Sequence, residues 1–170
     1  MPADQKKEKI AEDRALLNEQ NKEYAESLAK DLAKKEEKER VRVETEKREQ
    51  RKRTIHEYRE NLKDVVFSGS HRVMVRYPNG ARAVLGFSPS DRVERLFDAI
   101  FSNPACPDYF SVRSVYPRAQ ILCFPGWYRE VFNAEVDEES RVPKENGIEM
   151  KSFEESIIAN NSILFINTIH

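Results

Sequence analysis

The chain has 170 residues, enough for one sizeable domain and an extension rather than two large domains. Charged residues make up 35% and the mean hydropathy is −0.76, so part of the chain is too polar to belong to a core. Lys+Arg number 29 against 30 Asp+Glu, and this balance argues against nucleic-acid binding, which normally needs a basic excess.

The two cysteines and the apolar runs exclude further classes. Cys106 and Cys123 do not have metal-ligand spacing, and two thiols in a charge-rich chain indicate a reducing compartment. No apolar run approaches a membrane span, and the N-terminus lacks a signal-peptide core. We therefore expect a soluble cytoplasmic or nuclear protein that binds no membrane, metal or cofactor.

Residues 1–64 are predicted to form one long charged helix. From Asp4 to Asp64 there is no Gly or Pro, and strong helix formers dominate. The segment has 18 Lys+Arg and 17 Asp+Glu, so a neutral spacer or lever is favoured over a nucleic-acid-binding helix. Favourably ordered i,i+4 ion pairs are expected to support it, namely Glu36–Arg40, Glu44–Arg48 and Glu49–Arg53.

Two groups of apolar residues interrupt this polar helix. The first forms a stripe that predicts a short coiled coil or a contact with a partner helix: Ile10, Leu17, Tyr24, Leu28 and Leu32. The second is expected to dock on the domain that follows: Ile55, Tyr58, Leu62 and Val65.

Residues 65–70 are predicted to be a linker, broken by Ser68-Gly69-Ser70, before a domain over 71–170. Residues 71–77 alternate polar and apolar side chains as a strand does, Pro78-Asn79-Gly80 indicates a hairpin turn, and 81–87 form the returning strand. Ser88–Asp91 offers capping residues for a helix whose apolar face is Val93, Leu96, Phe97, Ile100 and Phe101.

The rest of the domain predicts two neighbouring strands, 110–115 and 121–124, and a central strand over 162–167. The order ββαββ is the ubiquitin-like β-grasp, so the fold class is α+β with a long charged helix in front. An insertion around 125–161 is expected to hold a short helix over Trp127–Phe132, an acidic loop over 136–147 and a helical turn over 153–158.

Between two of the predicted strands lies Tyr116-Pro117-Arg118. Proline cannot donate to a strand ladder, and an aromatic–proline bond is among the likelier ones to be cis. We expect a protruding tip whose ring buries apolar area in a partner's groove and whose guanidinium supplies hydrogen bonds. A plain surface turn is the competing interpretation.

Three motifs carry a resemblance to a known family. They are Val75-Arg76-Tyr77-Pro78-Asn79-Gly80, the helix Arg92–Ile100, and Val115-Tyr116-Pro117-Arg118. Together they resemble the UBX domain, the ubiquitin-regulatory-X module. The segment Gln20–Leu28 resembles the charged helix that precedes this domain in the Fas-associated-factor class, so the chain is similar to the C-terminal helix and UBX domain of such proteins.

The resemblance implies a non-enzymatic adaptor of valosin-containing protein, the hexameric AAA ATPase that extracts ubiquitylated proteins for degradation. It implies that Tyr116 and Pro117 fill the apolar part of a groove in the ATPase's N-terminal domain. Arg118 would reach polar groups there, and Arg76, on the neighbouring strand, would add a second guanidinium. Tyr116 stands where the family has Phe, so its hydroxyl needs a partner or a place at the rim. The helix would be free to contact ubiquitin-binding cofactors or ubiquitylated substrates.

Other functions fit less well. A conjugated ubiquitin-like modifier would need a Gly-Gly tail, and the chain ends Asn167-Thr168-Ile169-His170. Catalysis is not expected, because the three histidines stand near no nucleophile in the sequence and no glycine-rich phosphate loop exists. The alternative that stays open is a coiled-coil scaffold in which the helix is the working part, and stable homodimers through residues 10–32 would favour it.

Overall fold

A computed structural model of the protein describes residues 2–142 and 151–169. Contacts divide the chain into two compact units, Met1–Gln50 and Arg51–His170. The second unit therefore begins within the predicted helix, because the last turns of that helix pack against the domain. The boundaries predicted from the sequence, a helix that ends at 64, a linker over 65–70 and a domain that begins at 71, stay a prediction.

The long helix α1, Pro2–Asn61, confirms the helix predicted over 1–64, and the part of it up to Gln50 is the first unit. All its described side chains up to Gln50 are exposed. Arg42 pairs with Glu39 at 2.7 Å and with Glu46 at 3.6 Å, whereas Arg40 pairs with Glu37 rather than with the expected Glu36. Such exposed pairs contribute a few tenths of a kcal/mol each. None of the described helices combines the length and apolar content that a membrane crossing needs.

The second unit contains a five-stranded sheet in the order β2-β1-β5-β3-β4. Its strands are β1 His71–Arg76, β2 Arg82–Phe87, β3 Phe110–Ser114, β4 Ala119–Ile121 and β5 Ser162–Thr168. β5 runs parallel to β1 and antiparallel to β3. This topology confirms the predicted ubiquitin-like β-grasp and the central position of β5. The turn between β1 and β2 needs Gly80, whose φ is +86°.

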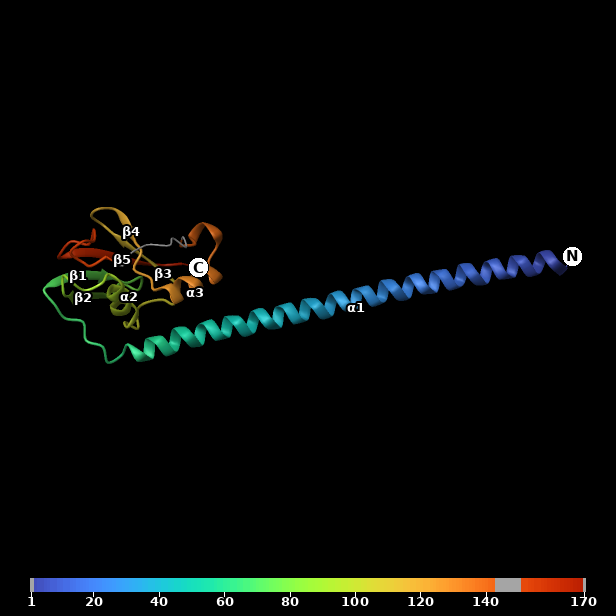
Figure 1. The fold of residues 1–170 in the computed structure, drawn as a ribbon, viewed down its shortest axis with the longest axis horizontal. Helices are drawn as coiled ribbons and strands as arrows, with labels where there is room; N and C mark the ends of the chain where they lie inside the picture. Colours follow the sequence, from blue (N-terminus) through green and yellow to red (C-terminus); the bar gives the residue numbers. More distant parts are fainter. Residues whose placement is uncertain (1, 143–150, 170) are drawn as a thin grey trace. The chain divides into compact units, whose positions relative to one another are not determined.

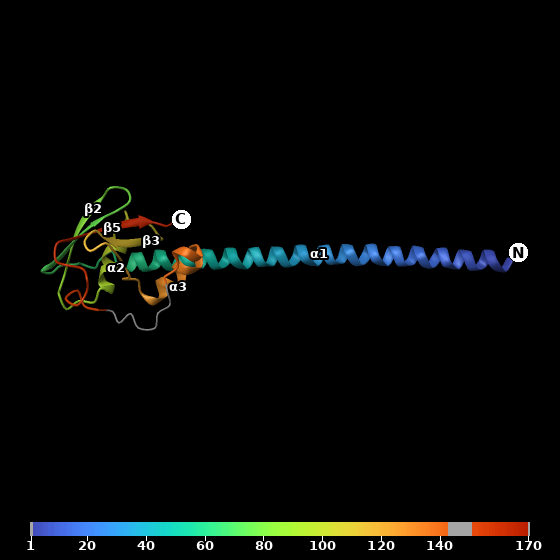
Figure 2. The same cartoon turned by 90° about the horizontal axis from the view of Figure 1, so that it is seen from above.

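α2, Glu94–Phe101, and α3, Gly126–Glu135, lie on one face of the sheet (Figure 1). α2 lies between the strands and the last turns of α1 in Figure 1, and Figure 2 again shows it beside those turns. α3 confirms the helix predicted in the insertion, and a 3₁₀ turn, Glu138–Ser140, follows it.

Four local predictions are wrong. Of the run 121–124 only Ile121 belongs to a strand, because the chain turns toward α3 at Pro125. Residues 153–155 form a single turn and 156–158 are irregular, so the expected helical turn over 153–158 is not formed. The residues Ser88–Asp91 do not cap α2, whose N-cap is Val93 without a side-chain bond; the Val93 amide donates instead to the Lys151 carbonyl. In the acidic loop Val136 and Val142 are buried, and 143–147 lie outside the described residues.

Aromatic side chains fill the space between the sheet and the helices. Phe97 is fully buried on α2, with its ring centroid 4.7 Å from that of Tyr128 on α3 and 5.0 Å from that of Phe101. The Tyr128 hydroxyl donates to the Asp108 carbonyl at 2.6 Å, so its polar end is satisfied. The insertion therefore contributes to the core rather than lying outside it.

The last turns of α1 dock on this core, as predicted, through Ile55 and Leu62, which are 2% and 8% exposed. The Tyr58 hydroxyl donates to the Asp98 carboxylate at 2.6 Å, and its ring lies 4.6 Å from that of Trp127. Arg51 pairs with Glu135 of α3 at 2.6 Å in a largely buried ion pair. Val65, the fourth expected contact, is exposed instead.

The linker passes so close to β2 that only glycine fits. A Cβ on Gly69 would lie 2.1 Å from the Phe87 carbonyl oxygen, and one on Gly86 would lie 2.8 Å from the Gly69 nitrogen. The two glycines therefore allow the linker between α1 and β1 to pack directly against the backbone of β2.

Replacement of Ile55 by Ala is expected to destabilise the domain by about 2 to 5 kcal/mol, because it leaves a cavity where α1 meets the core. Urea unfolding of the full chain measures the change. Leu28→Ala is the matched control, because Leu28 is 47% exposed. Equal losses for the two variants would contradict the docking of the last turns.

The Asp98 carboxyl makes the stability of the domain depend on pH in a specific direction. Burial raises its pKa, while the hydrogen bond from Tyr58 and the charge of Arg95 lower it part of the way back. The folded chain therefore holds this proton to a higher pH than the unfolded chain, where the pKa is about 4. The contribution of Asp98 to the free energy of unfolding is therefore largest below pH about 4 and is lost as the pH rises through the pKa of the folded state.

We expect the free energy of unfolding of the wild type, minus that of Asp98→Asn, to fall from about pH 4 toward neutrality and then level off. Urea unfolding at a series of pH values tests this. A difference that grows with pH would show that the carboxylate, not the acid, is the form that the fold prefers.

Candidate functional site

The connection between β3 and β4 places Tyr116, Pro117 and Arg118 at an exposed tip. Tyr116 is 88% exposed, and the Tyr116–Pro117 bond is cis. The tip is held at its base, because the Ser114 hydroxyl donates to the Tyr116 carbonyl at 3.2 Å and the Val115 amide donates to the Ile163 carbonyl at 3.3 Å. In Figure 1 this gold connection projects from the body of the domain near the label β4. An exposed ring on an anchored backbone suits contact with another molecule.

A groove of about 600 Å³ lies beside this tip. Its lining includes Arg118 from the connection, Arg113 and Val115 from β3 and the residue after it, and Phe165 from β5. The groove is open and unites two guanidinium groups with apolar side chains. It fits the surface of another protein better than it encloses a small molecule.

Arg76 reaches this face by a different route from the one expected. β1 is not adjacent to β3 or β4, because β5 lies between them. The Arg76 guanidinium carbon lies 5.5 Å from the centroid of the Phe165 ring, and Phe165 pairs in register with Arg113 on its other side. Arg76 and the tip therefore belong to one face of the sheet but are joined through Phe165 rather than by direct contact.

Sequence reasoning missed Phe165 and Arg113. Both lie on the open face because side chains alternate along a strand: Leu164 and Ile166 are buried, so Phe165 points the other way. The run 163–166 is apolar at every position, which predicts a strand buried on both faces, so no alternation in the sequence points to Phe165. Phe165, 36% exposed, corrects that interpretation.

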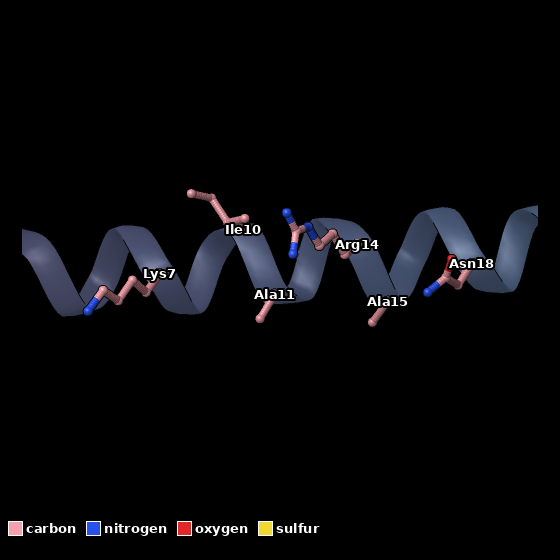
Figure 3. Close-up of a pocket in the computed structure, with 6 residues that line it drawn as sticks. All are labelled: Lys7, Ile10, Ala11, Arg14, Ala15 and Asn18. Carbon is pink, nitrogen blue, oxygen red and sulfur yellow. The ribbon is translucent and has the colours of Figure 1, made fainter.

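Outside this face, the described residues form no second candidate site of comparable build. Within residues 2–142 and 151–169 there is no group of His, Cys, Asp and Glu side chains that could hold a metal ion. On the first unit a shallow hollow lies along a single helix, and Figure 3 shows Ala11 and Ala15 pointing to one side while Ile10 points to the other. Its lining is fully exposed, so it is a helix surface rather than a built site.

Comparison with known proteins agrees with this geometry. The family model described as "UBX domain" matches residues 68–122, which contain β1 to β4, α2 and the exposed tip. The chain is also 61% identical over 168 residues to "UBX domain-containing protein 5" of Caenorhabditis elegans, an alignment that covers 96% of this chain and 95% of that protein.

The chain belongs to the UBX-domain protein family. Its domain is a protein-interaction module on an α+β, ubiquitin-like fold. The match ends at Leu122, so α3, which supplies Tyr128 and Phe132 to the core, and the central strand β5 lie outside the matched residues. Membership of the Fas-associated-factor class stays a prediction.

Both cysteines of the UBX domain are buried, Cys106 to 3% exposure and Cys123 to 0%. Burial raises the pKa of the Cys123 thiol to about 12, and it also raises that of Cys106. A nucleophilic cysteine needs a lowered pKa and access to solvent. Packing, not catalysis, accounts for these two side chains.

We expect neither thiol to react quickly with a thiol reagent such as Ellman's reagent at pH 8 while the protein is folded. Both are expected to react in denaturant, where the pKa returns to about 8.5. The measurement is a time course of absorbance with and without urea. Rapid labelling of the folded protein would refute the assignment of a structural role.

Proposed function

We propose that this protein is a non-enzymatic adaptor whose UBX domain binds the N-terminal domain of the hexameric AAA ATPase valosin-containing protein. The contact is made by the Tyr116-Pro117-Arg118 tip, with Arg76 contributing from β1. The protein acts in the cytoplasm or nucleus, where it assists the ATPase in extracting or unfolding ubiquitylated substrates.

The exposure of Tyr116 is the observation that carries this proposal. A tyrosine that is 88% exposed buries little surface in its own chain, although aromatic rings dominate the energy of protein interfaces. Because Ser114 and Val115 hold the backbone at its base, little conformational entropy is lost when the ring enters a groove.

Arg118 supports the same proposal. It is exposed and lines the groove beside the tip, where its five N–H donors are available to carbonyl and carboxylate groups of a partner. The Tyr116 hydroxyl forms no hydrogen bond among the residues that the structure describes, and at the rim of an interface it stays in water at no cost.

The coiled-coil scaffold remains the second candidate. The apolar stripe on the first unit is exposed, with Tyr24 70% and Leu17 57% accessible. A helix surface with these side chains has something to gain from a partner helix. The stripe is sparse, however, and charged residues surround it, so we place the primary interaction on the UBX domain and give the helix the role of a lever toward substrates or cofactors.

We expect Tyr116→Ala and Arg118→Ala each to weaken binding to the ATPase's N-terminal domain by about 1 to 3 kcal/mol, as interface hot spots do. Tyr116→Phe is expected to bind like the wild type if the hydroxyl stays at the rim. Isothermal titration calorimetry with the full chain measures these affinities.

Arg92→Ala provides the matched control, because Arg92 is exposed on the side of the domain that carries α2. Unchanged affinity for both tip variants would remove the tip from the interaction. Equal losses for the tip variants and Arg92→Ala would point to a general effect on folding.

A further inference from the structure

The open face of the sheet carries a row of three arginines, one phenylalanine and one glutamine that crosses all five strands. Strand register places Arg82 of β2 opposite Arg76 of β1, Arg76 opposite Phe165 of β5, Phe165 opposite Arg113 of β3, and Arg113 opposite Gln120 of β4. Paired residues in neighbouring strands share a face, so these side chains form one line. We call this set the arginine row.

An apolar row runs beside it. Val84 pairs with Met74, Met74 pairs with Ile163, and the Val115 amide donates to the Ile163 carbonyl. Val84 is 64% exposed and Val115 45%, so the row is open to solvent at both ends. Because Val115 immediately precedes Tyr116, the apolar row is continuous with the tip of the candidate site.

Charge is segregated onto this face. The five strands contain four arginines and no Asp, Glu or Lys. The domain as a whole is not basic, because residues 65–170 include 11 Lys+Arg and 13 Asp+Glu. The arginines of the sheet therefore have no carboxylate in any strand, because the acidic residues lie on helices and loops.

The free domain also bears a cost at this face. Arg76 and Arg82 are directly opposite each other, and like charges in that position destabilise a sheet. The Nε atom of Arg76 is shielded from solvent and has no hydrogen-bond partner among the described residues. The structure describes no ion pair for Arg76, Arg82 or Arg113 within residues 2–142 and 151–169. Carboxylates supplied from outside would relieve the repulsion between the two guanidinium groups.

We propose that the docking surface extends from the Tyr116-Pro117-Arg118 tip across the whole sheet face to β2. Its occupant is a folded protein surface that presents carboxylates along the arginine row and apolar side chains along the apolar row. The inference rests on the proposed function, in that this surface belongs to the same ATPase domain that receives the tip. Arg82 and Arg113, which lie outside the tip, are the residues that the extension adds.

Nucleic acid is a weaker match for the same face. Phosphates would satisfy the arginines, but they would leave Val84, Met74 and Ile163 against a polar backbone. Arg and Met beside exposed aliphatic side chains are instead the composition of protein interfaces. The apolar row therefore decides in favour of a protein.

The test measures binding of the full chain to the isolated N-terminal domain of the ATPase, by fluorescence anisotropy at low and at high salt. The double variant Arg82→Glu/Arg113→Glu is expected to lose at least tenfold in affinity at low salt, and the loss should shrink as salt screens the charges. Val84→Asp is expected to lose affinity at both salt concentrations. Arg92→Glu, a charge reversal on the side of α2, is the matched control and should stay within twofold of the wild type.

The outcomes separate the two proposals. Wild-type affinity of the double variant and of Val84→Asp, together with loss of binding by Tyr116→Ala, would overturn the extension and leave the tip as the whole site. Failure of the wild-type chain to bind would overturn the proposed function and the extension together. Binding of a short duplex DNA that the double variant loses would overturn the protein occupant in favour of nucleic acid. Urea unfolding and thiol protection confirm that each variant is folded.

Discussion

The insertion of β5 between β1 and β3 is the interaction on which the rest of this domain depends. It joins the first hairpin to the second, closes the core with Leu164 and Ile166, and anchors the tip through the bond from Val115 to Ile163. It also places Phe165 between Arg76 and Arg113. One strand near the end of the chain thus determines both the inner packing and the outer functional face, because alternate side chains of a strand serve opposite faces.

The inner face provides rigidity. Phe97, Phe101 and Tyr128 lie in contact beneath the sheet, and Ile55 and Tyr58 of α1 close the same core from outside α2. A well-packed core transmits position precisely to the strands above it. The strands that carry the tip and the arginine row therefore rest on a closely packed core, which on the proposed function would limit the reorganisation that binding requires.

On the proposed function, the outer face serves association at some cost to stability. Opposed arginines, an exposed tyrosine ring and exposed valines each cost the isolated domain something or contribute nothing to it. The domain tolerates them because its aromatic core and the docked end of α1 supply stability elsewhere. A near-neutral chain can thus carry a locally basic surface, since placement rather than composition determines the local field.

Local chemistry in the sequence was enough to predict the long helix, the first hairpin with Gly80, the exposed tip at Pro117, and the order ββαββ followed by the late central strand. Those features depend on propensity, turn residues and periodicity over a few neighbouring positions. The cap of α2 by the Lys151 carbonyl, the burial of Tyr128 and Phe132, and the line from Arg82 to Gln120 became visible only in the tertiary structure. Each of these features joins residues that are distant in the chain. The strand register and the helix packing that bring them together cannot be read from the spacing of nearby residues.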